Sequence, residues 1–219
     1  IISYLKSGEV DLNKVGIFMS QTGGGCRASN YVALLRKALK DMGMEQIPVI
    51  SVNMAGLEKN PGFKISKGII KRGMMAIMYG DLLMRVLYAT RPYEKVPGSA
   101  NALYEECCDM IRDNIVSGDM KEYKRLMKVI VEKFDQLPLL DIKKPRVGVV
   151  GEILVKYHPN ANNDIVNIIE SEGGEAVVPD LADFFLYGMY SKKFNFEHLS
   201  GSYKAMVFNK AAIKAIEYF

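Results

Sequence analysis

Two short apolar runs, separated by one amphipathic segment, constrain the fold of this chain more than any other feature. The run KVGIFMSQ (Lys14 to Gln21) is β-branched and apolar and ends in glycines, and IPVISVN (Ile47 to Asn53) is a second such run. Between them, apolar residues recur at helical spacing from Tyr31 to Met42, and Gly43 fits a C-terminal cap. Strand, helix and strand in this order predict a βαβ unit, whose crossover makes a parallel sheet.

A similar pattern recurs near the C-terminus. The run PRVGVVGE (Pro145 to Glu152) predicts a strand, and EAVVPD (Glu175 to Asp180) predicts another. Between them, isoleucines share one helix face that ends at two glycines, Gly173 and Gly174. Both strand-to-helix connections are rich in small polar residues, which indicates a weak internal duplication. The run KAMVFN (Lys204 to Asn209) predicts one more strand before a terminal helix from Ala211.

A helical insertion is expected between the two units. The apolar region Gly68 to Thr90 contains lysine, arginine and aspartate, which a membrane span tolerates poorly, so it predicts a buried helix of a soluble protein. The segment Ala89 to Glu106 contains prolines and predicts an ordered loop. Asp119 and Glu122 have the spacing of a capping box that opens a further helix.

These patterns predict an α/β fold with two small, Rossmann-like parallel-sheet halves and a helical insertion between them. The predicted divisions are 1–62 for the first half with its glycine-rich loop, 63–143 for the insertion, and 144–219 for the second half and C-terminal helix.

Charge and cysteine content narrow the class of protein. A net charge of +4, without a basic run that interleaves aromatics, argues against nucleic acid as a partner. Three cysteines are too few, and odd in number, for a disulfide framework, which favours the cytoplasm, and neither a signal peptide nor a membrane anchor is expected. Because the chain starts at Ile1, without Met, we expect it to be a piece of a longer polypeptide.

The loop SQTGGGCR, between the first strand and its helix, is the main candidate site. Ligands of open α/β sheets sit beyond the carboxyl ends of the strands, and the second half contributes its own loop there. Glycines permit close approach of a ligand to the backbone. The candidate binding residues are Ser20, Thr22, Gly23, Gly24, Gly25, Cys26, Arg27 and His158.

Several kinds of chemistry remain open for this loop. It matches neither the dinucleotide nor the P-loop pattern, so a nucleotide site is weakly supported, although the helix start would suit a phosphate. The helix start and Arg27 favour the thiolate of Cys26, which could ligate a metal, attack an electrophile with His158 as its base, or only pack in a turn. Cys107 and Cys108 are adjacent in a predicted helix, diverge, and are expected to be buried thiols.

Four segments together resemble a known family. QTGGGCRASNY, NPGFK, YGDLLMRVLYATRPYEKVPGSAN and PRVGVVGEILVKYHPNANN are similar to the C-terminal region of acyl-CoA dehydratase activase-related proteins of anaerobic bacteria. These are described as activators of (R)-2-hydroxyglutaryl-CoA dehydratase, and this part of them as 2-hydroxyacyl-CoA dehydratase-like. The resemblance runs along nearly the whole chain.

The resemblance implies ATP-driven transfer of a low-potential electron through [4Fe–4S] clusters to a dehydratase or related reductase. It makes Cys26 the candidate cluster ligand, with ATP bound only by modules outside this chain. The implied partners are upstream ATPase modules of the same polypeptide and a dehydratase subunit, and a homodimer is left open.

Two departures from the family pattern affect the cluster. A further family cysteine is expected upstream of Ile1, and the family pattern has another in FFLYGMY, where this chain has Gly188. The resemblance therefore implies that the isolated chain is free of a cluster and inactive alone, and it does not decide between an activator and an enzyme.

Overall fold

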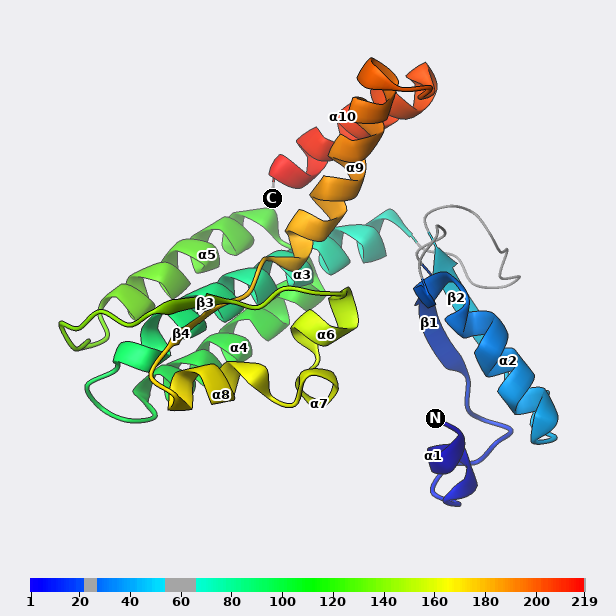
Figure 1. The fold of residues 1–219 in the computed structure, drawn as a ribbon, viewed down its shortest axis with the longest axis horizontal. Coiled ribbons are helices and arrows are strands. Elements are labelled where there is room, and N and C mark those ends of the chain that lie inside the picture. Colours follow the sequence, from blue (N-terminus) through cyan, green and yellow to red (C-terminus); the bar gives the residue numbers. More distant parts are fainter. Residues whose placement is uncertain (22–26, 54–65, 219) are drawn as a thin grey trace. The chain divides into compact units, whose positions relative to one another are not determined.

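The computed structural model describes residues 1–21, 27–53 and 66–218. The described residues form a mixed α/β structure that is mostly helical and contains two parallel sheets of two strands each (Figure 1). The chain divides into two compact units, Ile1–Ile65 (unit 1) and Ser66–Phe219 (unit 2). The expected second half and residues 66–143 of the expected insertion therefore lie in one unit.

Unit 1 contains the first predicted βαβ pattern. Strands β1 and β2 pair in parallel, with Ile17 opposite Val49 and Gln21 opposite Asn53. Apolar residues from α1, α2 and the segment before β2 form its core: Leu5, Leu35, Leu39, Met44 and Ile47. The described elements are α1 (Ile2–Lys6), β1 (Ile17–Gln21), the 3-10 helix η1 (Arg27–Ser29), α2 (Tyr31–Asp41) and β2 (Val49–Asn53).

Gly43 ends α2 as the sequence predicts. Its φ of 67° lies in the left-handed region, where glycine has no Cβ penalty. The N–H of Gly43 donates to Lys40 O, and the N–H of Met44 donates to Leu39 O at 2.8 Å, so carbonyls of the last turn are satisfied. The chain then turns back toward β2. The connection through α2 thus returns the chain to the start of a second strand, which pairs with β1 in parallel.

Unit 2 is built around three long helices. Its described elements are α3 (Lys67–Thr90), the 3-10 helix η2 (Arg91–Tyr93), α4 (Ser99–Ser117), α5 (Met120–Asp135), β3 (Arg146–Gly148), α6 (Ile153–Tyr157), α7 (Pro159–Asn162), α8 (Ile165–Ser171), β4 (Glu175–Val177), α9 (Leu181–His198) and α10 (Tyr203–Glu217). Strands β3 and β4 pair in parallel, Arg146 opposite Glu175 and Gly148 opposite Val177. The three-residue strands are shorter than predicted.

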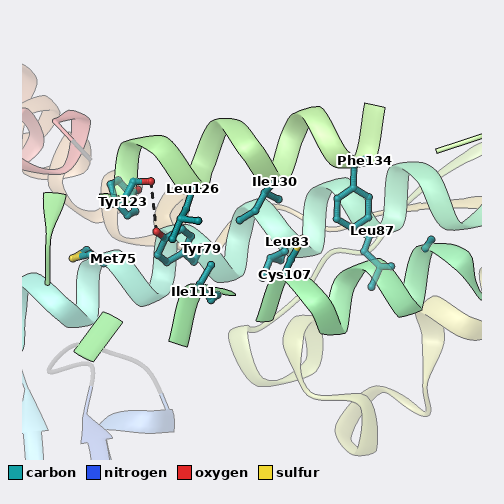
Figure 2. Packing of buried hydrophobic residues seen from close by; sticks show 11 residues of the cluster. Met75, Tyr79, Leu83, Leu87, Cys107, Ile111, Tyr123, Leu126, Ile130 and Phe134 are labelled. Carbon is teal, nitrogen blue, oxygen red and sulfur yellow. Dashed lines mark hydrogen bonds between the residues drawn. The ribbon is translucent and has the colours of Figure 1, made fainter. Parts of the chain in front are cut away.

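The core of unit 2 lies between α3, α4 and α5 (Figure 2). The hydroxyl of Tyr79 donates to Asn114 Oδ1 at 2.9 Å, and Asn114 Nδ2 donates to Asp119 O at 2.9 Å. These bonds satisfy polar groups that would otherwise be buried without partners. The buried apolar residues of this core are Met75, Tyr79, Leu83, Leu87, Ala100, Cys107, Ile111, Tyr123, Leu126, Ile130 and Phe134.

Helix α3 confirms the prediction of one long helix, but it is not largely buried, because only Met75, Tyr79, Asp81, Leu83 and Leu87 of its residues are buried. Among the described residues, none of the helices is both long enough and apolar enough to span a membrane. The expected loop from Ala89 to Glu106 is mostly helical instead, since α3 continues to Thr90 and α4 begins at Ser99. Glu94 explains the early start of α4, because its carboxylate accepts from the N–H groups of Gly98 and Ala100, at 2.6 and 2.8 Å.

The capping box before α5 forms only in part. Asp119 accepts from the N–H of Lys121 at 2.8 Å and so caps the helix as predicted. Glu122 does not complete the box, because its carboxylate binds Arg125, with Oε1 2.6 Å from the guanidinium. The backbone N–H of Asp119, which Glu122 would accept in a complete box, donates to Ser117 Oγ at 3.3 Å instead.

The strand predicted over Lys204 to Asn209 is wrong, since this segment forms the first turns of α10. Buried residues of α10 are Met206, Ile213 and Ile216, whose spacing fits a helix. The short apolar run that suggested a strand covers less than two turns of a helix. The helix-forming stretch from Lys210 onward continues it, so no switch of structure occurs at Ala211.

Candidate functional site

The carboxyl end of β1 contains the described part of the glycine-loop site. Ser20 is exposed on one face of the strand, while Gln21 is 9% exposed on the face that α2 covers. Gln21 Nε2 donates to Ser29 O at 2.7 Å, so one side chain joins the residues on either side of the loop. Gln21 Oε1 is buried and has no hydrogen-bond partner among the described residues. An unpaired buried acceptor is costly, which marks this strand end as unusual.

Most of the predicted loop lies outside the described residues, namely Thr22, Gly23, Gly24, Gly25 and Cys26. Their predicted roles therefore stay predictions. After the loop, Arg27 begins η1 and is exposed.

The helix that follows the loop starts later than the thiolate argument assumes. Helix α2 begins at Tyr31, and η1 lies between Cys26 and that start in the chain. The field of a helix terminus is felt mainly within its first turn. The dipole of α2 therefore acts mainly on residues near Tyr31. Arg27 is the described positive charge that is closest to Cys26 in the sequence.

His158 lies in unit 2, at the junction of α6 and α7. It is exposed, and its extended backbone (φ −107°, ψ 107°) is the conformation expected before proline. Its N–H donates to Leu154 O, and its carbonyl accepts from Ala161 N–H at 2.9 Å. The backbone of His158 thus ends one helix and begins the next, while its pairing with Cys26 stays a prediction.

The loop from Tyr157 to Asp164 uses its polar side chains internally. Asn163 and Asp164 both have left-handed backbone, at φ of 56° and 57°, which is uncommon for residues other than glycine. Asn162 Nδ2 donates to Val155 O at 2.8 Å, and Asp164 Oδ2 accepts from Asn167 Nδ2 at 2.8 Å. These bonds stabilise the tight turn into α8, and they occupy groups that a ligand would otherwise use.

Sequence reasoning missed a polar cluster at the carboxyl end of β4. Asp81 of α3 is 8% exposed and accepts from the N–H groups of Leu181 and Ala182, both at 2.8 Å. Asp81 therefore caps α9 from one hundred positions away, while the side chain of the local N-cap residue Asp180 makes no cap bond. Arg85, one turn after Asp81, forms an ion pair with Asp180.

Two ionisable groups of this cluster are shifted. Burial raises the pKa of the Asp180 carboxyl above its usual range, while Arg85 opposes that rise. Burial first, and then neighbouring carboxylates, raise the pKa of Tyr157 to about 12, and its hydroxyl donates to Pro179 O at 2.7 Å. The cluster satisfies its own donors and acceptors, so it attaches α9 to α3 rather than forming an open site.

The signal for this cluster was present in the sequence. Asp81 and Arg85 are charged residues four apart inside the apolar segment that forms α3. The sequence argument used them only to exclude a membrane span. Charges within a helix that is otherwise apolar also predict a specific partner, because a buried charge needs one.

The two described cysteines are poor candidates for a reactive or ligating thiol. Cys107 is fully buried in α4, and burial raises the pKa of its thiol to about 11. Cys108 is only half-buried, so the prediction of two buried thiols is confirmed for Cys107 alone. Within 1–21, 27–53 and 66–218, histidine, cysteine and carboxylate side chains do not gather in threes at a spacing suited to a metal ion.

Comparison of the chain with protein-family models, with curated proteins and with solved structures gives no match.

Proposed function

We propose that the chain is a dehydratase-like, Rossmann-like module of a larger cytoplasmic iron–sulfur protein. That protein would transfer electrons in an ATP-dependent reaction related to the activation of (R)-2-hydroxyacyl-CoA dehydratases. The four segments similar to the activase-related family motivate the reaction. The partners are ATPase modules of the same polypeptide and a dehydratase subunit.

The strand end at Gln21 is the observation that carries the proposal. The bond from Gln21 Nε2 to Ser29 O brings the two sides of the glycine loop together at its base. A loop closed at its base, on the carboxyl edge of a parallel sheet, can present a side chain such as Cys26 to a ligand. Gln21 Oε1 has no partner among the described residues, so it can accept a hydrogen bond from a donor at the base of the loop.

The chain's own residues fit one position of a [4Fe–4S] cluster. Cys26 would supply a thiolate, and such clusters usually take four. Cys107 is excluded by its burial in the core and its raised thiol pKa. The remaining ligands would come from outside this chain, which agrees with the family cysteine expected upstream. When bound, the cluster would supply one-electron transfer at low potential.

The test is anaerobic reconstitution of the full-length protein, followed by iron analysis and EPR. We expect Cys26→Ser to remove most of the cluster signal, because a lost thiolate leaves an incomplete ligand set. Cys108→Ser is the matched control, since it removes a half-buried thiol that the proposal does not use. If Cys26→Ser retains full cluster content, or both variants lose it equally, the assignment of Cys26 is wrong.

The alternative function is a non-catalytic docking domain whose glycine loop holds a phosphate-bearing group such as CoA or a nucleotide. Calorimetric titration with coenzyme A and with ATP separates the two functions. Binding that is unchanged in Cys26→Ser, in a protein without cluster signal, would replace the iron–sulfur proposal with this alternative.

A further inference from the structure

We draw no further inference here: the strongest candidate, the apolar groove between α3 and α5 that is lined by Leu82, Met127, Lys128, Val131 and Glu132, is open to the surface, and nothing in the structure shows what covers it.

Discussion

The two small parallel sheets of this protein have the same construction and use their carboxyl ends differently. At the end of β4, Asp81 accepts two backbone N–H groups of α9, and Arg85 pairs with Asp180. At the end of β1, Gln21 makes one bond, to Ser29 O, and leaves Oε1 without a partner among the described residues. Polar groups at the edge of unit 2 are engaged in holding the fold, while those described in unit 1 are in part unengaged.

One ion pair of unit 2 is largely buried, although unit 2 also has exposed pairs such as Arg112–Asp109, with 71% of each side chain exposed. Arg91 and Glu170 pair in unit 2 with only 18% and 13% of their side chains exposed, whereas Lys37 and Asp41 pair in unit 1 with 71% and 52% exposed. A buried polar group must be satisfied for the fold to form, and an exposed one need not be. The comparison therefore identifies Arg91–Glu170 as a pair on which the fold of unit 2 depends, whereas the Lys37–Asp41 pair should contribute little to stability.

The largest expected effect is at the buried ion pair. The guanidinium of Arg91 donates to both carboxylate oxygens of Glu170, at 2.7 and 3.0 Å, and so joins η2 to α8. Glu170→Gln keeps the shape and leaves a largely buried positive charge unpaired, which should cost about 3 kcal/mol. Urea unfolding measures this loss of stability, and hydrogen exchange in peptides of α8, measured separately, shows whether α8 opens.

Asp41→Asn is the corresponding change in unit 1. Because that pair is exposed and lies on one helix, its loss should cost less than about 0.5 kcal/mol. Equal destabilisation by the two substitutions would show that the contrast in burial between the two pairs has no energetic consequence.

The second effect, smaller than the first, is at the cap of α9. Asp81→Ala removes the acceptor of two backbone N–H groups, which would then be buried without a partner, at a cost of about 2 kcal/mol. We expect faster hydrogen exchange at the start of α9, measured by mass spectrometry of its peptides.

Asp183→Asn provides the control, since Asp183 is exposed in the first turn of the same helix. Its favourable interaction with the helix dipole is worth only about 0.5 kcal/mol. If exchange in α9 rises equally in both variants, Asp81 does not act as its cap.

Local patterns were sufficient to predict the elements whose stability is local. The strands ending at Gln21 and Asn53, the helix capped by Gly43 and the cap at Asp119 each follow from a few neighbouring residues. The strand predicted from Lys204 was wrong because a short apolar run fits a strand and a helix equally well, and the packing of Met206 and Ile213 in α10 decides between them.

Contacts between distant segments could not be predicted in the same way. Asp81 caps residues one hundred positions away, and Glu170 meets Arg91 across 79 positions, so neither partner is visible in a local window. The positions of Asp81 and Arg85 inside an apolar helix indicate only that each side chain needs a polar or charged partner, not which residue that partner is. At the candidate site, the glycine pattern predicted the location of the loop. It did not predict the hydrogen bond from Gln21 to Ser29 O, because that bond depends on how close the chain at Ser29 comes to β1.

The smallest expected effect on stability is at Gln21, and it is the most informative. Gln21→Leu preserves most of the volume, removes the bond to Ser29 O and also removes Oε1, a buried acceptor with no partner among the described residues. Ser29 O loses this donor, which is unfavourable, while the loss of the buried Oε1 is favourable, so the two effects offset and the free energy of unfolding should change by less than about 1 kcal/mol. Chemical denaturation followed by circular dichroism measures this change. In the full-length protein, the same substitution should lower iron content after reconstitution, because the base of the loop is no longer closed. A loss of stability as large as that of Asp81→Ala would mean that Gln21 is a structural residue, and the distinction between the two sheet edges would then fail.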